Sequence, residues 1–68
     1  MPVTRIEIAD DVRAAFAHGP ASRPDVLAAA VAAHARPAVM ETLERLPDRS
    51  YSELRHLWSE LADIPLEP

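Results

Sequence analysis

Apolar residues recur at helical spacing in four segments of the chain, and proline or glycine separates the segments. In the first segment, residues 4–18, the side chains of Ile8, Val12 and Phe16 recur every four positions and form one stripe. The segment closes with His-Gly-Pro, where Gly19 can adopt the left-handed conformation that ends many helices. The pattern predicts a first helix over residues 4–18.

The start of this helix can be interpreted in two ways. Thr4 and Glu7 have the spacing of a capping box, in which each side chain bonds the other residue's free backbone N–H. Apolar and polar residues alternate over residues 5–8, which is instead typical of a short extended arm. Both interpretations of residues 4–8 stand at this point.

The second segment opens with residues that favour the start of a helix. Ser22 is a good N-cap, and Pro24 and Asp25 suit the first turn. Most of the following residues are alanine, so the predicted helix is apolar nearly all round. Such a helix is expected to lie centrally, with close neighbours. The spacing expected for one face of a helix, i, i+3, i+4 and i+7, is found for Leu27, Ala30, Val31 and His34.

The third segment lies between two prolines. Pro37 suits the first position of a helix, and Pro47 ends it. Glu41 and Arg45 are four positions apart, in the favourable order for an ion pair on the solvent side. The predicted apolar side consists of Val39, Met40, Leu43 and Leu46.

The fourth segment carries the most regular amphipathic pattern of the chain. Ser50 and Glu53 have capping-box spacing and predict its start. Two prolines near the end predict an extended tail over residues 62–68, which carries Ile64 and Leu66. The apolar stripe of the fourth helix consists of Leu54, Leu57, Trp58 and Leu61.

These segments predict an all-α protein. We expect one domain over residues 1–68, a compact bundle of three or four short helices with an extended C-terminal tail. No alternation of apolar and polar residues is strong enough to predict a sheet. A chain of 68 residues buries only about 60% of its unfolded surface, and without cysteine it has no disulfides. Regular helix packing or association with a partner is then the remaining source of stability.

Composition and charge exclude classes of function rather than indicating one. The net charge of −4 disfavours nucleic-acid binding, which relies on clusters of basic residues. The sequence shows no secretory signal and no apolar run of about 18 residues, so we expect a cytoplasmic protein without a membrane span. Nothing in the sequence indicates a cofactor or a small-molecule ligand.

Candidate catalytic and metal-ligating residues are few. His18, His34 and His56 are far apart in the sequence, and no close pair has metal-ligand spacing. On the fourth helix, Ser52, His56 and Glu60 would align as a nucleophile, a base and its orienting carboxylate. They would lie opposite the apolar stripe, on a wet face where nothing excludes water. We therefore predict no metal site, no catalytic residue and no enzymatic activity.

One stretch of the sequence resembles a known family. Pro-Ala, a capped helix, a short break and then Leu-x-x-Leu-Pro-Asp-Arg-x-aromatic are similar to a small bacterial family of unknown function, the DUF family numbered 2795. The resemblance implies a small helical domain and no established activity. The family usually has a glycine near the break between the second and third helices, where this chain reads Ala-His-Ala-Arg-Pro. The matching positions are Pro20, Ala21, Ser22, Leu27, Leu43, Leu46, Pro47, Asp48, Arg49 and Tyr51.

The Pro-Asp-Arg-Ser-Tyr corner and the apolar end of the chain carry the candidate interaction residues. Each residue of the corner except Arg49 has a structural role as a turn, cap or core residue. Trp58 is either an anchor of the core or a binding residue, and the tail packs either on its own domain or on another chain. The predicted partner-binding residues are Arg49, Tyr51, Trp58, Ile64 and Leu66.

The sequence thus favours a non-enzymatic protein-interaction or accessory module of a bacterial cytoplasmic complex, with a protein partner or a second copy of the chain as its ligand. The alternative is a small helix-turn-helix-like regulator that binds nucleic acid. It would use the third and fourth helices, with Arg45, Arg49 and Arg55 on phosphates. Acidic residues are interleaved with these arginines, which favours surface ion pairs instead.

Overall fold

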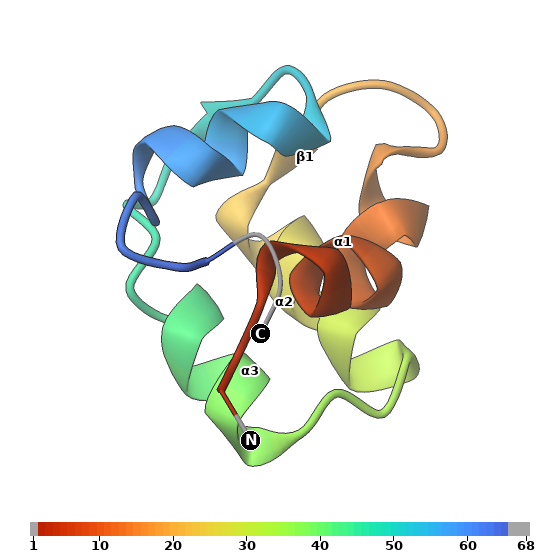
Figure 1. Ribbon diagram of the computed structural model, residues 1–68. Coiled ribbons are helices and arrows are strands. Elements are labelled where there is room, and N and C mark those ends of the chain that lie inside the picture. Colours follow the sequence, from red (N-terminus) through yellow and green to blue (C-terminus); the bar gives the residue numbers. More distant parts are fainter. Residues whose placement is uncertain (1, 66–68) are drawn as a thin grey trace.

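The computed structural model describes residues 2–65 of the chain (Figure 1). Short helices make up most of it, and a two-stranded antiparallel sheet joins two of the connections between them. In chain order the elements are helix α1 (Arg5–Val12), the 3-10 helix η1 (Arg13–Phe16), strand β1 (Ala21–Ser22), helix α2 (Arg23–Ala32), helix α3 (Pro37–Leu43), strand β2 (Ser50–Tyr51) and the 3-10 helix η2 (Leu54–Ser59).

The core lies where α1, α2, α3 and η2 meet. Each of these elements turns aliphatic residues inward, and α1 crosses in front of α2 in Figure 1. Of the three aromatic residues, Tyr51 is buried, whereas Phe16 and Trp58 are only partly buried at the edge of the core. Aliphatic side chains and alanine therefore fill most of its centre. The buried hydrophobic residues are Ile8, Val12, Ala21, Val26, Ala30, Val39, Leu43, Leu46, Tyr51, Leu57, Leu61 and Ile64.

Helix α1 begins at the predicted cap. The Thr4 Oγ1 atom accepts a hydrogen bond from the Glu7 backbone N–H at 3.1 Å, so the extended-arm interpretation of residues 5–8 is wrong. The second half of the capping box does not form, because the Glu7 carboxylate binds Arg36 instead. The helix tightens into η1 after Val12, and Gly19 then takes a left-handed φ of 122°.

Helix α2 has the predicted start and buries part of the predicted stripe, since Ala30 is buried and Leu27 packs against the core. Ser22 and Asp25 form a complete capping box, with Pro24 in the first turn. Val26 and Ala30 are buried, whereas Val31 is 64% exposed. The predicted stripe was therefore wrong at Val31, because alanine on every side of the helix leaves little contrast from which to read its orientation. Contacts with α1, α3, η1 and β1 confirm its central position.

Helix α3 also starts as predicted, with Pro37 at its first position. It ends at Leu43, and turns carry the chain on to Leu46. The predicted ion pair between Glu41 and Arg45 is absent from the interactions of residues 2–65. Arg45 instead donates two hydrogen bonds to the carboxylate of Asp63, at 2.8 and 3.2 Å, and so ties the end of α3 to the segment after η2.

The sheet is the main correction to the all-α prediction. Ala21 pairs with Tyr51, and Ser22 pairs with Ser50, in antiparallel register. Strands of two residues are too short to show the alternation from which strands are predicted. Ser50 therefore lies in β2 rather than in a capping box with Glu53, and that predicted cap was wrong.

The fourth helix is shorter than predicted and has 3-10 geometry. η2 covers Leu54–Ser59 and has no side-chain cap. Leu57 and Leu61 are buried, and Leu54 and Trp58 are partly buried against the core. Two members of the predicted stripe thus face inward completely, and the other two remain accessible at one edge.

The described part of the tail packs on its own domain. A turn follows η2, so residues 62–65 are not the extended tail that the prolines predicted. Ile64 is 9% exposed and belongs to the core. The Pro65 carbonyl accepts a hydrogen bond from the Arg5 backbone N–H at 2.8 Å, which brings the end of this segment to the start of α1. Leu66 lies outside the described residues.

Candidate interaction surface

An apolar groove of about 430 Å³ runs between α1 and η2. Ile6 projects from α1 into this region and is 49% exposed. Leu54 and Trp58 form the opposite wall, each with one side against the core and another toward the groove. Trp58 is therefore both an edge of the core and accessible at the surface, and its role in binding stays a prediction. The residues lining the groove are Arg5, Ile6, Ala9, Glu53, Leu54, Arg55 and Trp58.

Arg5 gives this groove a positive charge that no carboxylate within residues 2–65 neutralises. Its guanidinium carbon lies 5.6 Å from the centre of the Trp58 ring, in cation–π contact. Within residues 2–65 its side chain has no carboxylate or carbonyl partner, and its buried Nε atom lacks an acceptor. Each other arginine binds a carboxylate or a backbone carbonyl of this same segment. The positive charge of Arg5 is thus the least neutralised of the arginine charges in the described fold.

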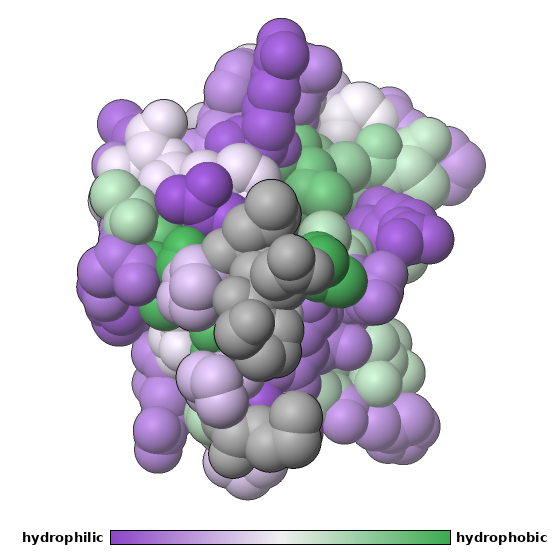
Figure 2. Space-filling view, in the orientation of Figure 1, coloured by the Kyte–Doolittle hydropathy of each residue, from purple (hydrophilic) through white to green (hydrophobic). Residues whose placement is uncertain are grey.

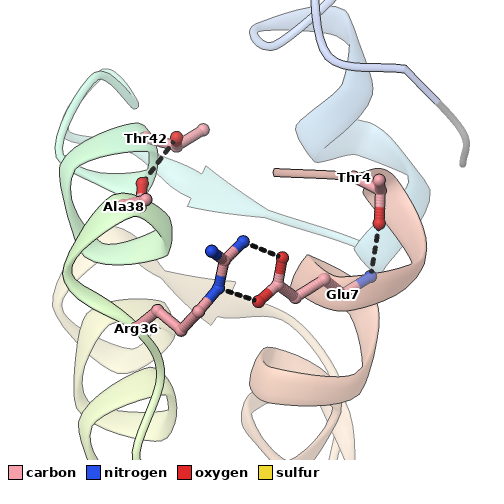
Figure 3. A network of polar contacts seen from close by, with 5 residues as sticks. All are labelled: Thr4, Glu7, Arg36, Ala38 and Thr42. Atoms are coloured by element: carbon pink, nitrogen blue, oxygen red, sulfur yellow. Dashed lines mark hydrogen bonds and ion pairs between the residues drawn. The ribbon is translucent and has the colours of Figure 1, made fainter. Parts of the chain in front are cut away.

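A second pocket, of about 410 Å³, lies on the other flank of α1 and is acidic. Glu7, Asp10 and Asp11 line it, together with Arg36. Figure 3 shows the Glu7 carboxylate facing the Arg36 guanidinium, with two hydrogen bonds of 2.7 Å each. Ile6 borders this pocket as well as the groove. The outer face of α1 therefore separates a basic apolar groove from an acidic pocket.

The carboxylates of the acidic pocket are not equivalent. Hydrogen bonds from Arg36 hold the pKa of Glu7 below its usual value. Burial, reinforced by the neighbouring carboxylates of Glu7 and Asp10, raises the pKa of Asp11. Glu7 is thus neutralised by the fold, whereas Asp11 and Asp10 keep an excess of negative charge on this flank. Within residues 2–65 no group of three ligating side chains is arranged to hold a metal ion.

The Pro-Asp-Arg-Ser-Tyr corner is held together by its own residues. Tyr51 is 2% exposed, and its hydroxyl donates a hydrogen bond to the Pro47 carbonyl at 2.8 Å. The Arg49 guanidinium lies over the Tyr51 ring and pairs with the Glu60 carboxylate at 3.0 Å. Arg49 therefore has a role in the fold that the sequence did not reveal: it joins β2 to the end of η2.

The polar residues beside this corner do not form a catalytic set. Ser52 and His56 border a shallow pocket of about 270 Å³ with Arg49. η2 has 3-10 geometry, so residues four apart do not align as they would on an α-helix. Glu60 is held by Arg49, and His56 lies 3.8 Å from Glu53 instead. The alignment of Ser52, His56 and Glu60 that an α-helix would give is absent here.

The four predicted partner-binding residues that the structure describes are not brought together. Tyr51 and Ile64 lie inside the fold, Trp58 lines the groove, and Arg49 lies at the corner. Leu66 is outside the described residues. Binding by any of them stays a prediction.

Two groove residues, Arg5 and Ile6, were missed by the sequence reasoning. Ile6 carried a usable signal, since it is an isolated large aliphatic residue outside the Ile8–Val12 stripe. Figure 2 shows hydrophobic residues reaching the surface of one face of the molecule, bordered by hydrophilic ones.

The arginines of the proposed helix-turn-helix are held in ion pairs. Arg45 binds Asp63, Arg49 binds Glu60, and Arg55 binds Glu53. Strand β2 lies between α3 and η2, and η2 is a short 3-10 helix. The three arginines assigned to phosphates are thus each paired with a carboxylate of residues 2–65.

Comparison with known proteins decides the family. A family model described as a protein of unknown function, DUF2795, matches residues 3–58. The chain belongs to the DUF2795 family. The match spans α1 through most of η2, so both walls of the groove lie within the DUF2795 region. No curated protein and no solved structure matches the chain.

The connection between α2 and α3 has an unusual backbone conformation. His34 takes a positive φ of 59° there. A left-handed residue just after a helix is most often glycine, because other side chains are strained there. Separately, no helix in the described part of the chain is long and apolar enough to cross a membrane.

Proposed function

We propose that this DUF2795 protein is a non-enzymatic interaction module, an accessory component of a bacterial cytoplasmic complex, and that it binds its partner through the groove between α1 and η2. The observation that carries the proposal is the combination of exposed Ile6, accessible Trp58 and the unneutralised guanidinium of Arg5 around one groove. Tryptophan and arginine are the residue types that most often dominate binding energy at protein interfaces.

The charge of the groove gives the interaction its selectivity. Arg55 is balanced by Glu53 at 2.9 Å, so Arg5 supplies the net positive charge of the lining. A partner that covers Ile6 and Trp58 with apolar groups and faces Arg5 with a carboxylate satisfies the whole surface. Covering the groove also shields the cation–π pair from water, which strengthens it.

The lack of convergent chemistry supports a role in binding rather than catalysis. The histidines and serines of the described chain do not assemble with a carboxylate in a water-excluding cleft, as general acid–base or nucleophilic catalysis requires. The acidic pocket has one carboxylate already bound by Arg36 and is open to solvent on α1.

A pull-down with matched surface variants tests this function. Tagged protein is incubated with nuclease-treated lysate of the source organism, and wild type is compared with Ile6→Glu and Val31→Glu. Val31 is the control, because it is an exposed aliphatic residue on α2 and does not line the groove. We expect a specific protein, or the chain itself, to be retained by wild type and Val31→Glu and lost by Ile6→Glu. Equal retention by all three proteins would refute the groove as the binding surface.

A further inference from the structure

The outer face of α1 has the residue pattern of a single coiled-coil heptad. Ile6 and Ala9 are three positions apart and occupy the two core positions of a heptad, while Arg5 and Asp10 take the flanking positions. The opposite face of the same helix carries Ile8 and is buried. Helix α1 is thus apolar on two sides, and within residues 2–65 only the side with Ile8 is buried.

The two flanks of this outer face carry opposite charges. Arg5 lies on the groove flank, and Asp10 lies on the flank with the acidic pocket. Arg5 has no carboxylate partner within residues 2–65. Among residues 2–65 Asp10 is bound only by Arg13, in a pair whose side chains are 62% and 74% exposed, and such a pair contributes little stability. Both charges are therefore available for an interaction with another chain.

We propose that the occupant of the groove is a second copy of this chain, which docks with its α1 parallel to the first α1 about a two-fold axis. In a parallel pair, the flank before the first core position of one helix faces the flank after the second core position of the other. Arg5 of each copy then meets Asp10 of the other copy, and the two Ile6 side chains meet at the centre. This inference rests on the proposed function, because it assigns the ligand of the same groove.

The direction of the pairing follows from the charges. In an antiparallel pair related by a two-fold axis, each flank meets the same flank of the other copy. Arg5 would then face Arg5, and the acidic flanks would face each other, which like-charge repulsion opposes. Only the parallel arrangement joins unlike flanks on both sides of the axis.

The size of the chain sets the strength expected of the dimer. The accessible surface is 4171 Å², and a standard interface takes about 800 Å² from each partner, or about a fifth of it. A helix of eight residues cannot provide that area alone, so the groove wall formed by Leu54 and Trp58 must contribute. We expect a dimer that dissociates in the micromolar range, and association of this kind supports folding in chains with a small core.

Charge reversal provides the test. Sedimentation equilibrium over protein concentrations from about 1 µM to 1 mM, which spans weak dimers, is run at low salt. We expect wild type and Val31→Glu to dimerise, and Arg5→Glu and Asp10→Arg each to raise the dimer Kd by about tenfold or more. The double variant Arg5→Glu/Asp10→Arg, and an equimolar mixture of the two single variants, should regain the dimer because each restores unlike charges. Circular dichroism melting of every variant checks that it is folded, and the mixture experiment does not require the double variant to fold.

The outcomes separate this inference from the proposed function. A monomer at every concentration, or a dimer indifferent to both charge reversals, overturns the parallel α1 pairing. If the chain is monomeric and Ile6→Glu still loses a different protein from the lysate, the groove is an interaction surface for that protein and only the dimer is refuted. If the chain is monomeric and retrieves nothing, both the dimer and the proposed function are refuted.

Discussion

The two flanks of α1 use arginine in opposite ways. On the acidic flank, Arg36 binds Glu7 with two hydrogen bonds and ties α1 to the start of α3 (Figure 3). On the groove flank, Arg5 lies over Trp58 and has no carboxylate within residues 2–65. Arginine at the surface of a small domain therefore does not indicate binding by itself. The arginine whose charge the fold leaves unneutralised, beside exposed apolar residues, is the one to examine for a partner.

The largest difference in the free energy of unfolding should appear between alanine variants of two leucines in η2. Leu57 is completely buried in the core, whereas Leu54 is partly exposed along the groove. Leu57→Ala should lower the free energy of unfolding by about 2–5 kcal/mol, because it leaves a cavity. Leu54→Ala should lower it by about 1 kcal/mol. Urea denaturation of both variants measures the difference, and equal losses would show that the groove wall is part of the core.

We next expect the charged residues of the two flanks to differ in how much they stabilise the fold. Glu7→Gln removes an ionised partner of Arg36 and should lower the melting temperature. Arg5→Ala should change the free energy of unfolding by less than about 1 kcal/mol, because it removes only an exposed cation–π contact and a buried Nε without an acceptor. Arg5→Ala should instead weaken dimerisation. A large loss of stability in Arg5→Ala would contradict the assignment of this residue to binding.

Two carboxylates one turn apart on the acidic flank should respond to pH with opposite signs. The pKa of Glu7 is lower in the folded chain than its usual value of 4.5. Ionised Glu7 therefore stabilises the fold above pH 4.5, and this stabilisation is lost as the pH falls through the pKa of the folded chain. The pKa of Asp11 is higher in the folded chain than its usual value of 3.8. Protonated Asp11 therefore favours the fold below pH 3.8, and this stabilisation is lost as the pH rises through the pKa of the folded chain.

Melting temperatures of the two neutral variants between pH 3 and pH 7 measure this difference. Glu7→Gln should be less stable than wild type at pH 7 and should approach it at pH 3. Asp11→Asn should be more stable than wild type at pH 7, with the gain disappearing at pH 3. The same sign for both variants at pH 7 would contradict the different environments assigned to the two side chains.

The smallest effect concerns the connection that leads to Arg36. His34 has a left-handed φ of 59° and an exposed side chain, so glycine should fit this position with less strain. His34→Gly should raise the free energy of unfolding by about 0.5–1 kcal/mol, and His34→Val should lower it, since β-branched residues tolerate this conformation poorly. Thermal denaturation of the two variants measures both changes. An unchanged melting temperature in both would remove the strain argument.

Local signals in the sequence predicted the places where helices begin. Thr4, Ser22 and Pro37 start their helices as expected, because caps and first-turn prolines act within a few residues. The stripe of α2 was misjudged because alanine surrounds Val31, and the sheet was missed because each strand has two residues. Helix four was predicted as an α-helix, yet residues 54–59 form a 3-10 helix after strand β2.

The interaction surface could be predicted only in part. Trp58 was a candidate, but its partners Arg5 and Ile6 are about fifty residues away in the sequence, and only tertiary packing brings them together. The role of Arg49 was hidden for the same reason, since Glu60 comes from beyond η2. Tyr51 was a candidate as part of the Pro-Asp-Arg-Ser-Tyr corner, and Ile64 as an apolar residue of the tail, and the fold buries both.

The fluorescence of Trp58 tests the central claim most directly, because it is the only tryptophan in the chain and lies in the groove. Emission and iodide quenching are recorded across the concentrations over which sedimentation shows monomer converting to dimer. If a second copy covers the groove, emission should shift to shorter wavelength and quenching should fall as dimer forms, and Asp10→Arg should delay both changes to higher concentration. Emission and quenching that stay constant while the dimer forms would place the interface elsewhere and contradict the assignment of the groove.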